Sequence, residues 1–407
     1  MKNKVRLPAR RHLTRLQSNP NAKLVFSMLA VAISLAVFLA ILSAELPAFV
    51  KALLAIGVLA CCGTAIAFVF RLDSWAGMVL LRSQHGLEEL DSLARKHPKL
   101  WQKFADIGLV IGFGTLAHFL MNKRHSSFRS AASTYVIGTL LLILVSALLP
   151  LAMNTLLSML TGGSEFATAG AKLQASLSGS PIVKFGWLAL LLFGGISLMT
   201  TAGIILYGLV VANAVIQALL GNGAMLAATS PGGVPIIPGI NLDLIQGVLA
   251  LAVILIVHEG MHGVLARLYR LPLKSAGLIF FGFLPFGAFV DIDEKKLFKA
   301  KKTQQNSVFV AGTAANFATA LIFLILLFAY AALASSAPAL KSVWLGELFA
   351  LIFALNMIIA AINLVPLPLF DGYYLMKNGV GNALAARAIT YVVGASFLLA
   401  LLPWVLR

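Results

Sequence analysis

Two histidines and a glutamate stand together in the segment VHEGMHG, Val257–Gly263, at the end of a long apolar run. On a helix, His258 and His262 share one face, because residues four positions apart lie about 6 Å from each other along the axis. Two imidazoles placed in this way can bind one metal ion, and neutral imidazole suits zinc. Glu259 then takes the position of a general base that contacts a metal-activated water. The alternative is a pair of packed core histidines.

A third protein ligand is expected, because a catalytic zinc is held by three side chains and keeps one position open. The other histidines lie in loops or far upstream, which leaves Asp371 in NLVPLPLFDG, Asn363–Gly372, as the candidate. The two prolines of this segment end the preceding helix, and irregular backbone at membrane depth occurs only where protein or a cavity surrounds it. We therefore predict His258, His262 and Asp371 as zinc ligands. The alternative for Asp371 is an ordinary cytoplasmic turn.

The position of these charges argues for a function. Among the fourteen acidic residues, we expect only Glu259 and Asp371 to lie within or against apolar spans, away from loop charges. A charged side chain at the centre of a membrane costs about 2.5–3.5 kcal/mol on insertion scales, so such residues are interpreted as functional by default.

The rest of the chain must place this site in a membrane. Of its 407 residues, 60% are hydrophobic and 11% are charged, whereas soluble domains carry about 25% charged residues. The sequence predicts an all-α polytopic membrane protein with about nine transmembrane helices. The expected spans are Leu24–Leu42, Leu53–Phe70, Ile107–Leu120, Tyr135–Met153, Phe185–Leu220, Leu244–Arg267, Val308–Ala334, Leu345–Val365 and Ala386–Val405. The third is short, and the fifth is taken as one tilted helix, with two short helices as the alternative.

The basic residues predict an orientation. The net charge is +17, with seven Lys and Arg between Lys2 and Lys23 and five more between Lys295 and Lys302. Positive loops favour the cytoplasmic side, so we expect a multi-pass protein of the cell membrane with a cytoplasmic N-terminus. Nucleic-acid binding is the alternative for basic clusters, and no nucleic-acid partner is expected. Residues Arg71–Lys103 are predicted to form a cytoplasmic amphipathic helix, with GLEELDSLARKH as its polar part.

Four regions follow from this topology. They are a basic cytoplasmic N-terminus (1–23), an accessory transmembrane region (24–220), an extracytoplasmic Pro/Gly loop (221–243) and a catalytic core of four spans (244–407). Within the core, the segment 274–296 has a short apolar stretch broken by glycines and a proline, which favours a small re-entrant hairpin that dips into the membrane. The alternative is an amphipathic interfacial loop. No loop is long enough for a peptide-binding module of the PDZ kind.

These motifs resemble those of the site-2 protease family of intramembrane zinc metalloproteases, and most closely its archaeal members without a PDZ domain. The resemblance covers about Pro231–Val405, together with the stretch KLWQKFADIGLVIGFG, Lys99–Gly114. HEGMH is similar to the family's zinc-binding helix, and NLVPLPLFDG is similar to its N-x-x-P-x-P-x-x-D-G pattern. AGTAANF, Ala311–Phe317, is similar to its A-G-P-x-x-N segment, although Thr313 replaces the usual proline.

The resemblance implies a role for each matching residue. His258, His262 and Asp371 would be ligands of Zn2+, and Glu259 would be the catalytic base. Asn363 would contact the substrate backbone, and Asn316 fits the asparagine of the third motif as a second candidate. For both asparagines the alternative is a hydrogen bond between helices inside the bundle. The family also has a β-hairpin near the active site, which supports a hairpin in segment 274–296.

The expected function is hydrolysis of peptide bonds in transmembrane or membrane-proximal segments of protein substrates, as in regulated intramembrane proteolysis. The partners are then a transmembrane protein substrate and the lipid bilayer, and the oligomeric state is left open. Two alternatives use the same metal site: a membrane transporter and a non-catalytic membrane scaffold. A transporter often shows internal repeats and broken helices in both halves, and here the broken segment lies only in the second half.

Overall fold

The computed structural model of the chain describes residues 20–46, 48–84, 86–121, 128–161, 181–233, 236–239, 241–337 and 342–406. Within these ranges, nine helices are long and apolar enough to cross a membrane, which confirms the predicted all-α polytopic fold. The predicted basic N-terminus lies outside the described residues except for its last four, 20–23.

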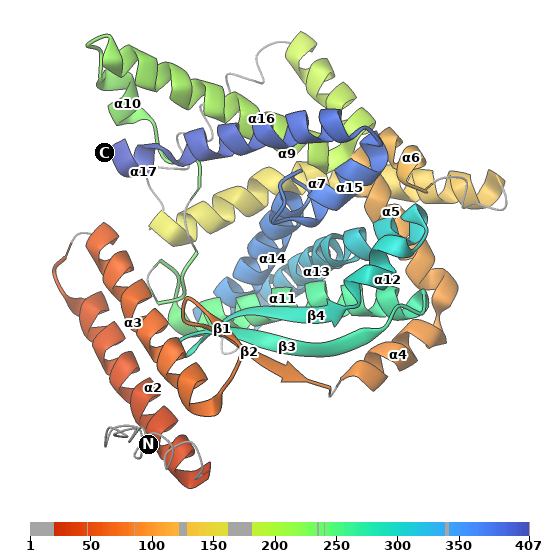
Figure 1. The fold of residues 1–407 in the computed structure, drawn as a ribbon. Coiled ribbons are helices and arrows are strands. Elements are labelled where there is room, and N and C mark those ends of the chain that lie inside the picture. Colours follow the sequence, from red (N-terminus) through yellow and green to blue (C-terminus); the bar gives the residue numbers. More distant parts are fainter. Residues whose placement is uncertain are drawn as a thin grey trace, which may run out of the picture.

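Figure 1 shows how the helices are arranged. The long ones are α2 (Pro20–Ser43), α3 (Ala48–Phe70), α5 (Pro98–Phe113), α7 (Phe128–Thr161), α9 (Pro181–Leu219), α11 (Leu244–Leu268), α13 (Lys302–Ser336), α14 (Val343–Asn363) and α16 (Ala383–Leu401). A 3-10 turn (Gly114–Leu116) and α6 (Ala117–Met121) continue α5. The short ones are α4 (Leu87–Lys96), α10 (Ala224–Ala228), α12 (Glu294–Lys299), α15 (Asp371–Val380) and α17 (Pro403–Leu406).

The third span is longer than predicted. It runs from Pro98 to Met121, because its first two turns are amphipathic and are hidden from a hydropathy count. Asp106 lies in this part of α5 and is 3% exposed. The expectation that only Glu259 and Asp371 lie within or against apolar spans was therefore wrong. The helix is pressed against α13, since a Cβ placed on Gly108 would lie 2.6 Å from the Cβ of Ala314.

The fifth span, Phe185–Leu219, counts as one span by length and composition, but it consists of two helices that meet at a kink. Gly195 has φ 62° and ψ −159° in the middle of α9. A Cβ at this position would lie 2.5 Å from the carbonyl of Gly112 in α5. Glycine is therefore required here both for the backbone conformation and for the close approach of the two helices.

Four short strands form one antiparallel sheet in the order β1-β2-β3-β4. They are β1 (Ser74–Trp75), β2 (Met78–Ser83), β3 (Leu273–Phe281) and β4 (Leu284–Ile292). The hairpin β3–β4 confirms the strand pair expected in segment 274–296, while its entry into the membrane stays a prediction. The helical interpretation of Arg71–Lys103 holds for α4 but was wrong for residues 74–83. Strand β2 forms because it pairs with β3, about 200 positions away. The local sequence pattern gives no information about such a distant partner.

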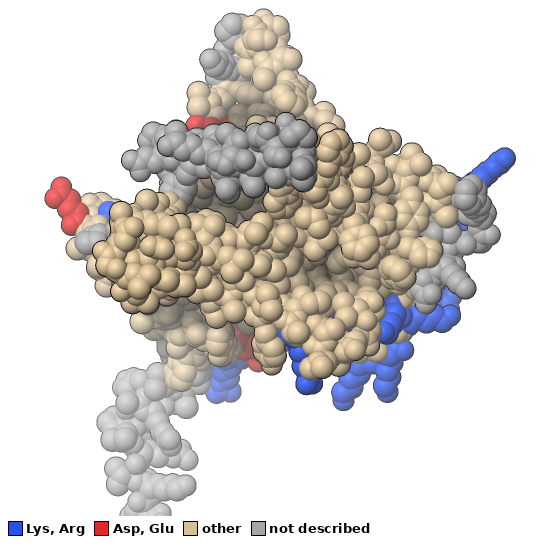
Figure 2. Space-filling model, turned by 90° about the horizontal axis from the view of Figure 1, so that it is seen from above, with Lys and Arg blue, Asp and Glu red and all other residues tan. Residues whose placement is uncertain are grey.

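The core of the molecule is the group α11, α13 and α14, with α5 and α7 packed against it and the sheet across α11. In Figure 1 the pair α2–α3 stands to one side. Phe38, Ala55 and Leu59 of this pair pack against Leu284 at the turn of the β3–β4 hairpin. In Figure 2 most of the visible Lys and Arg lie along one side, and most of the remaining visible surface carries no charge. This distribution suits a multi-pass membrane protein.

Candidate metal centre

Helix α11 positions the two histidines. It begins at Asp243, whose carboxylate accepts a hydrogen bond from the backbone N–H of Gln246 at 2.9 Å and so caps the helix. The apolar run that follows keeps the helix intact to Leu268. His258 and His262 therefore lie one turn apart on the buried side of α11, and each is 8% exposed.

The structure brings all three predicted ligands together. The Nε2 atoms of His258 and His262 are 3.1 Å apart, and each lies 3.3 Å from Oδ2 of Asp371. Zinc bonds to nitrogen and oxygen are about 2.0–2.1 Å long, so three ligand atoms of a tetrahedral site stand about 3.3–3.4 Å from one another. The triangle formed by these three atoms has that size. The donor set and its spacing therefore fit zinc.

Hydrogen bonds behind the two imidazoles orient them. Nδ1 of His262 lies 2.6 Å from the carbonyl oxygen of Val308 and donates to it. This leaves the Nε2 lone pair free to face Asp371. Nδ1 of His258 lies 3.2 Å from the amide of Asn316, which is fully buried and whose oxygen has no other partner. With that amide turned by 180°, its oxygen accepts from Nδ1–H of His258 and gains the missing hydrogen bond.

Asp371 begins helix α15 directly after the proline-broken segment that follows α14. The segment turns back on itself, since a Cβ on Gly372 would lie 2.2 Å from the carbonyl oxygen of Leu364. The same oxygen accepts a hydrogen bond from Ser197 of α9 at 2.7 Å. Metal binding requires the carboxylate of Asp371 to be ionised.

Gly312 of α13 belongs to this site and was missed by the sequence interpretation. A Cβ on Gly312 would lie 2.5 Å from Nε2 of His262 and 2.6 Å from Nε2 of His258. Only glycine lets the backbone of α13 pass this close to both ligand atoms. The available signal was its place in AGTAANF beside Thr313, but the spacing along one chain does not reveal which helix faces it.

A cavity of about 270 Å³ opens at the three predicted ligands. Its polar lining is His258, Glu259, His262, Asn363 and Asp371, and its apolar lining comes from β4, α12, α13 and Leu369. Oε2 of Glu259 accepts a hydrogen bond from the backbone N–H of Val290 in β4 at 3.3 Å. Of the two asparagines considered for substrate contact, the structure brings Asn363 to the cavity, whereas Asn316 lies behind His258.

A first prediction concerns Asn316. Its replacement by Ala removes the hydrogen bond that orients His258, and loss of such an outer partner typically weakens metal binding by about 10–100-fold. Competition with a zinc chelator measures this change in the purified protein. Asn356→Ala is the matched control, because Asn356 is also fully buried but bonds within its own helix, to Ile352. Equal zinc affinity in the two variants would refute the orienting role.

Comparison with known proteins supports the same region. Residues 246–402 match peptidase family M50. An uncharacterised protein of Methanocaldococcus jannaschii is 38% identical over 73 residues, which is 18% of this chain and 20% of that relative. The aligned part thus spans about a fifth of the relative's length. No solved structure matches this chain.

The match to family M50 and the geometry of the three side chains both indicate zinc as the cofactor. Members of peptidase family M50 are zinc-dependent, and the His258–His262–Asp371 group has the donors and the spacing that zinc requires. Zinc is therefore the metal that this group of residues fits. Residues 246–402, less than half of the chain, thus resemble peptidase family M50, the site-2 protease family.

Proposed function

We propose that the protein is an intramembrane zinc metalloprotease that hydrolyses peptide bonds in transmembrane or membrane-proximal segments of substrate proteins. One observation carries the proposal: two imidazoles and a carboxylate meet at the spacing of a zinc site, beside a second carboxylate, among apolar helices. In this proposal residues 244–407 are the catalytic core, and the N-terminus lies in the cytoplasm.

The chemistry divides between the metal and Glu259. When bound, zinc supplies a Lewis acid that makes water a nucleophile near neutral pH. Glu259 lines the same cavity as the three ligands but is not one of them, so its carboxylate is free to take a proton. It accepts the proton of the attacking water and passes it to the amide nitrogen as the C–N bond breaks. The water oxygen is retained in the new carboxylate of the product.

A substrate helix must unwind before it is cut, because its backbone carbonyls are held in its own hydrogen bonds. The edge of β4 offers new partners for the unwound segment. Val290 directs its N–H away from β3 and toward Glu259. Since alternate residues of a strand face the same edge, the backbone groups of Ala288 and Ile292 face this edge as well. A substrate strand paired there by β-augmentation lies next to Glu259.

Asn363 is the side chain placed to hold the substrate backbone at the cavity. It is the last residue of α14 and lies partly exposed among the residues that line the cavity. Its amide is both donor and acceptor, so it can bond to a peptide group of an extended segment. Asn316 stays a weaker candidate for this role because it is fully buried behind His258.

The test of the proposal is cleavage of a single-span reporter protein by the purified enzyme in lipid vesicles. We expect products cut within or beside the apolar segment. Removal of zinc with a chelator should abolish cleavage, and added zinc should restore it. An intact reporter after incubation with zinc-loaded protein would contradict the proposal. Zinc uptake into the vesicles without cleavage would support a transporter instead.

A further inference from the structure

The sheet beside the metal centre is completed from outside the M50 region. Residues 246–402 contain the hairpin β3–β4, whereas β1 and β2 come from residues 74–83. Strand β2 pairs with β3 along its whole length, from Met78 opposite Phe281 to Ser83 opposite Ala276. The outer edge of β3 is therefore covered, and β4 is left as the edge strand next to α11.

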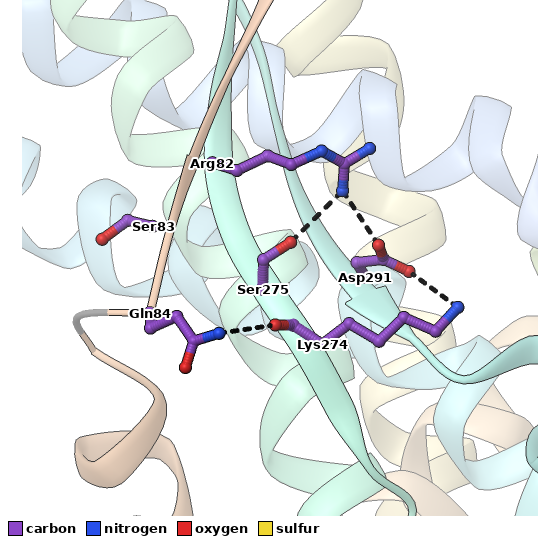
Figure 3. A pocket seen from close by; sticks show the side chains of 6 residues that line it. All are labelled: Arg82, Ser83, Gln84, Lys274, Ser275 and Asp291. Carbon is purple, nitrogen blue, oxygen red and sulfur yellow. Dashed lines mark hydrogen bonds and ion pairs between the residues drawn. The ribbon is translucent and has the colours of Figure 1, made fainter. Parts of the chain in front are cut away.

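One side chain of β2 reaches across the sheet. Arg82 places Nη1 2.9 Å from Oδ2 of Asp291 on β4 and 3.3 Å from Oγ of Ser275 on β3. Figure 3 shows this guanidinium directed over β3 toward Asp291, with Lys274 approaching the same carboxylate from the other side. The nitrogen of Lys274 is 3.7 Å from Oδ1 of Asp291. These residues line a cavity of about 320 Å³.

Arg82 contacts Phe289 and Asp291 of β4, the two residues that flank Val290. Its guanidinium carbon lies 5.3 Å from the centre of the Phe289 ring, a cation–π contact. Asp291 is the residue that follows Val290, and Val290 donates its N–H to Glu259. The planar guanidinium holds its partners in a fixed geometry, which a lysine does not. Arg82 therefore restrains the short piece of β4 that faces Glu259.

The ion pair between Arg82 and Asp291 is too exposed to contribute much to folding stability. The side chains of Arg82 and Asp291 are 43% and 27% exposed, and ion pairs of this kind contribute little to folding stability. The ion pair can still affect catalysis by positioning β4, because a small displacement of a substrate-binding group has a large effect on the reaction rate. The contacts join three strands at the end of the sheet that lies nearest Glu259, where a displacement of β4 would move the proposed substrate-pairing edge.

We propose that Arg82 is a positioning residue that holds β4 at the distance from α11 at which a paired substrate strand lies against Glu259. This inference rests on the proposed function and assigns a role in substrate binding to the region before the M50 match. The accessory region thus supplies a third strand and its cross-sheet arginine to the catalytic core.

Two substitutions separate this role from a general electrostatic effect. Asp291→Asn and Asp73→Asn each remove one carboxylate partner of Arg82, since Asp73 lies 3.3 Å from its Nε, but only Asp291 is on β4. We expect Asp291→Asn to raise KM for the reporter by about tenfold, because the amide no longer carries the negative charge that strengthens the hydrogen bond from Arg82. Its kcat and zinc content should stay near the wild-type values. Asp73→Asn should leave KM unchanged, and so should Lys274→Ala.

Hydrogen exchange gives a readout that does not depend on cleavage. Amides of residues 288–292 should exchange faster in Asp291→Asn and in Arg82→Lys than in the wild type or in Asp73→Asn. Equal KM values and equal exchange in Asp291→Asn and Asp73→Asn would overturn the positioning role and leave the proposed function standing. A wild-type protein that does not cleave would overturn the proposed function, and the exchange experiment would still test the restraint on β4.

Discussion

Replacing Glu259 by Gln is expected to lower the rate of peptide hydrolysis by about 10²–10⁴-fold, the usual contribution of a general acid–base group. Zinc content should remain at the wild-type level, because Glu259 is not among the three side chains whose donor atoms converge. Glutamine preserves the size of the side chain and can still accept the N–H of Val290, which Glu259 accepts at 3.3 Å. The substitution therefore removes the proton acceptor and little else.

The measurement is single-turnover cleavage of the reporter at matched zinc content. Glu294→Gln serves as the control, because Glu294 is an exposed carboxylate at the start of α12, close to the end of β4. It should cleave at the wild-type rate. Hydrolysis by Glu259→Gln at a rate close to that of the wild type would contradict the role of Glu259, and loss of its zinc would mean that Glu259 is a ligand.

Replacing Gly312 by Ala is expected to abolish zinc binding and, with it, hydrolysis. The added Cβ would lie 2.5 and 2.6 Å from the two Nε2 atoms that face the metal, closer than non-bonded atoms approach. To admit it, α13 must move away from α11 or both imidazoles must turn. Either change breaks the triangle of donors, whose sides are 3.1 and 3.3 Å.

The control for this variant lies inside the HEGMH motif of α11. Gly260 follows Glu259, and a Cβ on it would meet nothing within 4 Å. Gly260→Ala should therefore keep its zinc and unfold at a temperature no lower than the wild type, because alanine favours a helix over glycine by about 1 kcal/mol. Zinc content by elemental analysis and thermal unfolding measure both variants. A Gly312→Ala protein that holds a full equivalent of zinc would refute the close-packing account.

Part of the site could be predicted because it depends on spacing within one element. His258 and His262 share a face of a helix whatever surrounds it, and the apolar run before them places that helix in a membrane. Asp371 was found because prolines and a carboxylate at the end of an apolar span are costly unless they serve a site. The structure places these three residues together, while their roles in metal binding and the role of Glu259 stay predictions.

Other features of the fold and the site depend on contacts between elements that are distant in the sequence. Local sequence patterns do not reveal these contacts. Gly312 matters only because α13 crosses α11 at the two imidazoles. Strand β2 exists because β3 accepts it as a partner, so an amphipathic helix was the natural interpretation of its segment. Asn316 was assigned to the substrate by resemblance, but its position behind His258 follows from which face of α13 turns toward α11.

The most direct test of the central claim is cleavage of the reporter in water labelled with heavy oxygen, followed by mass spectrometry of the products. The account predicts a cut within or beside the apolar segment, with one heavy oxygen atom in the new C-terminal carboxylate. The same products should be absent with Glu259→Gln and with chelated wild type. An uncut reporter with zinc-loaded wild type, or labelled products that persist with Glu259→Gln, would contradict the assignment of this site to peptide hydrolysis.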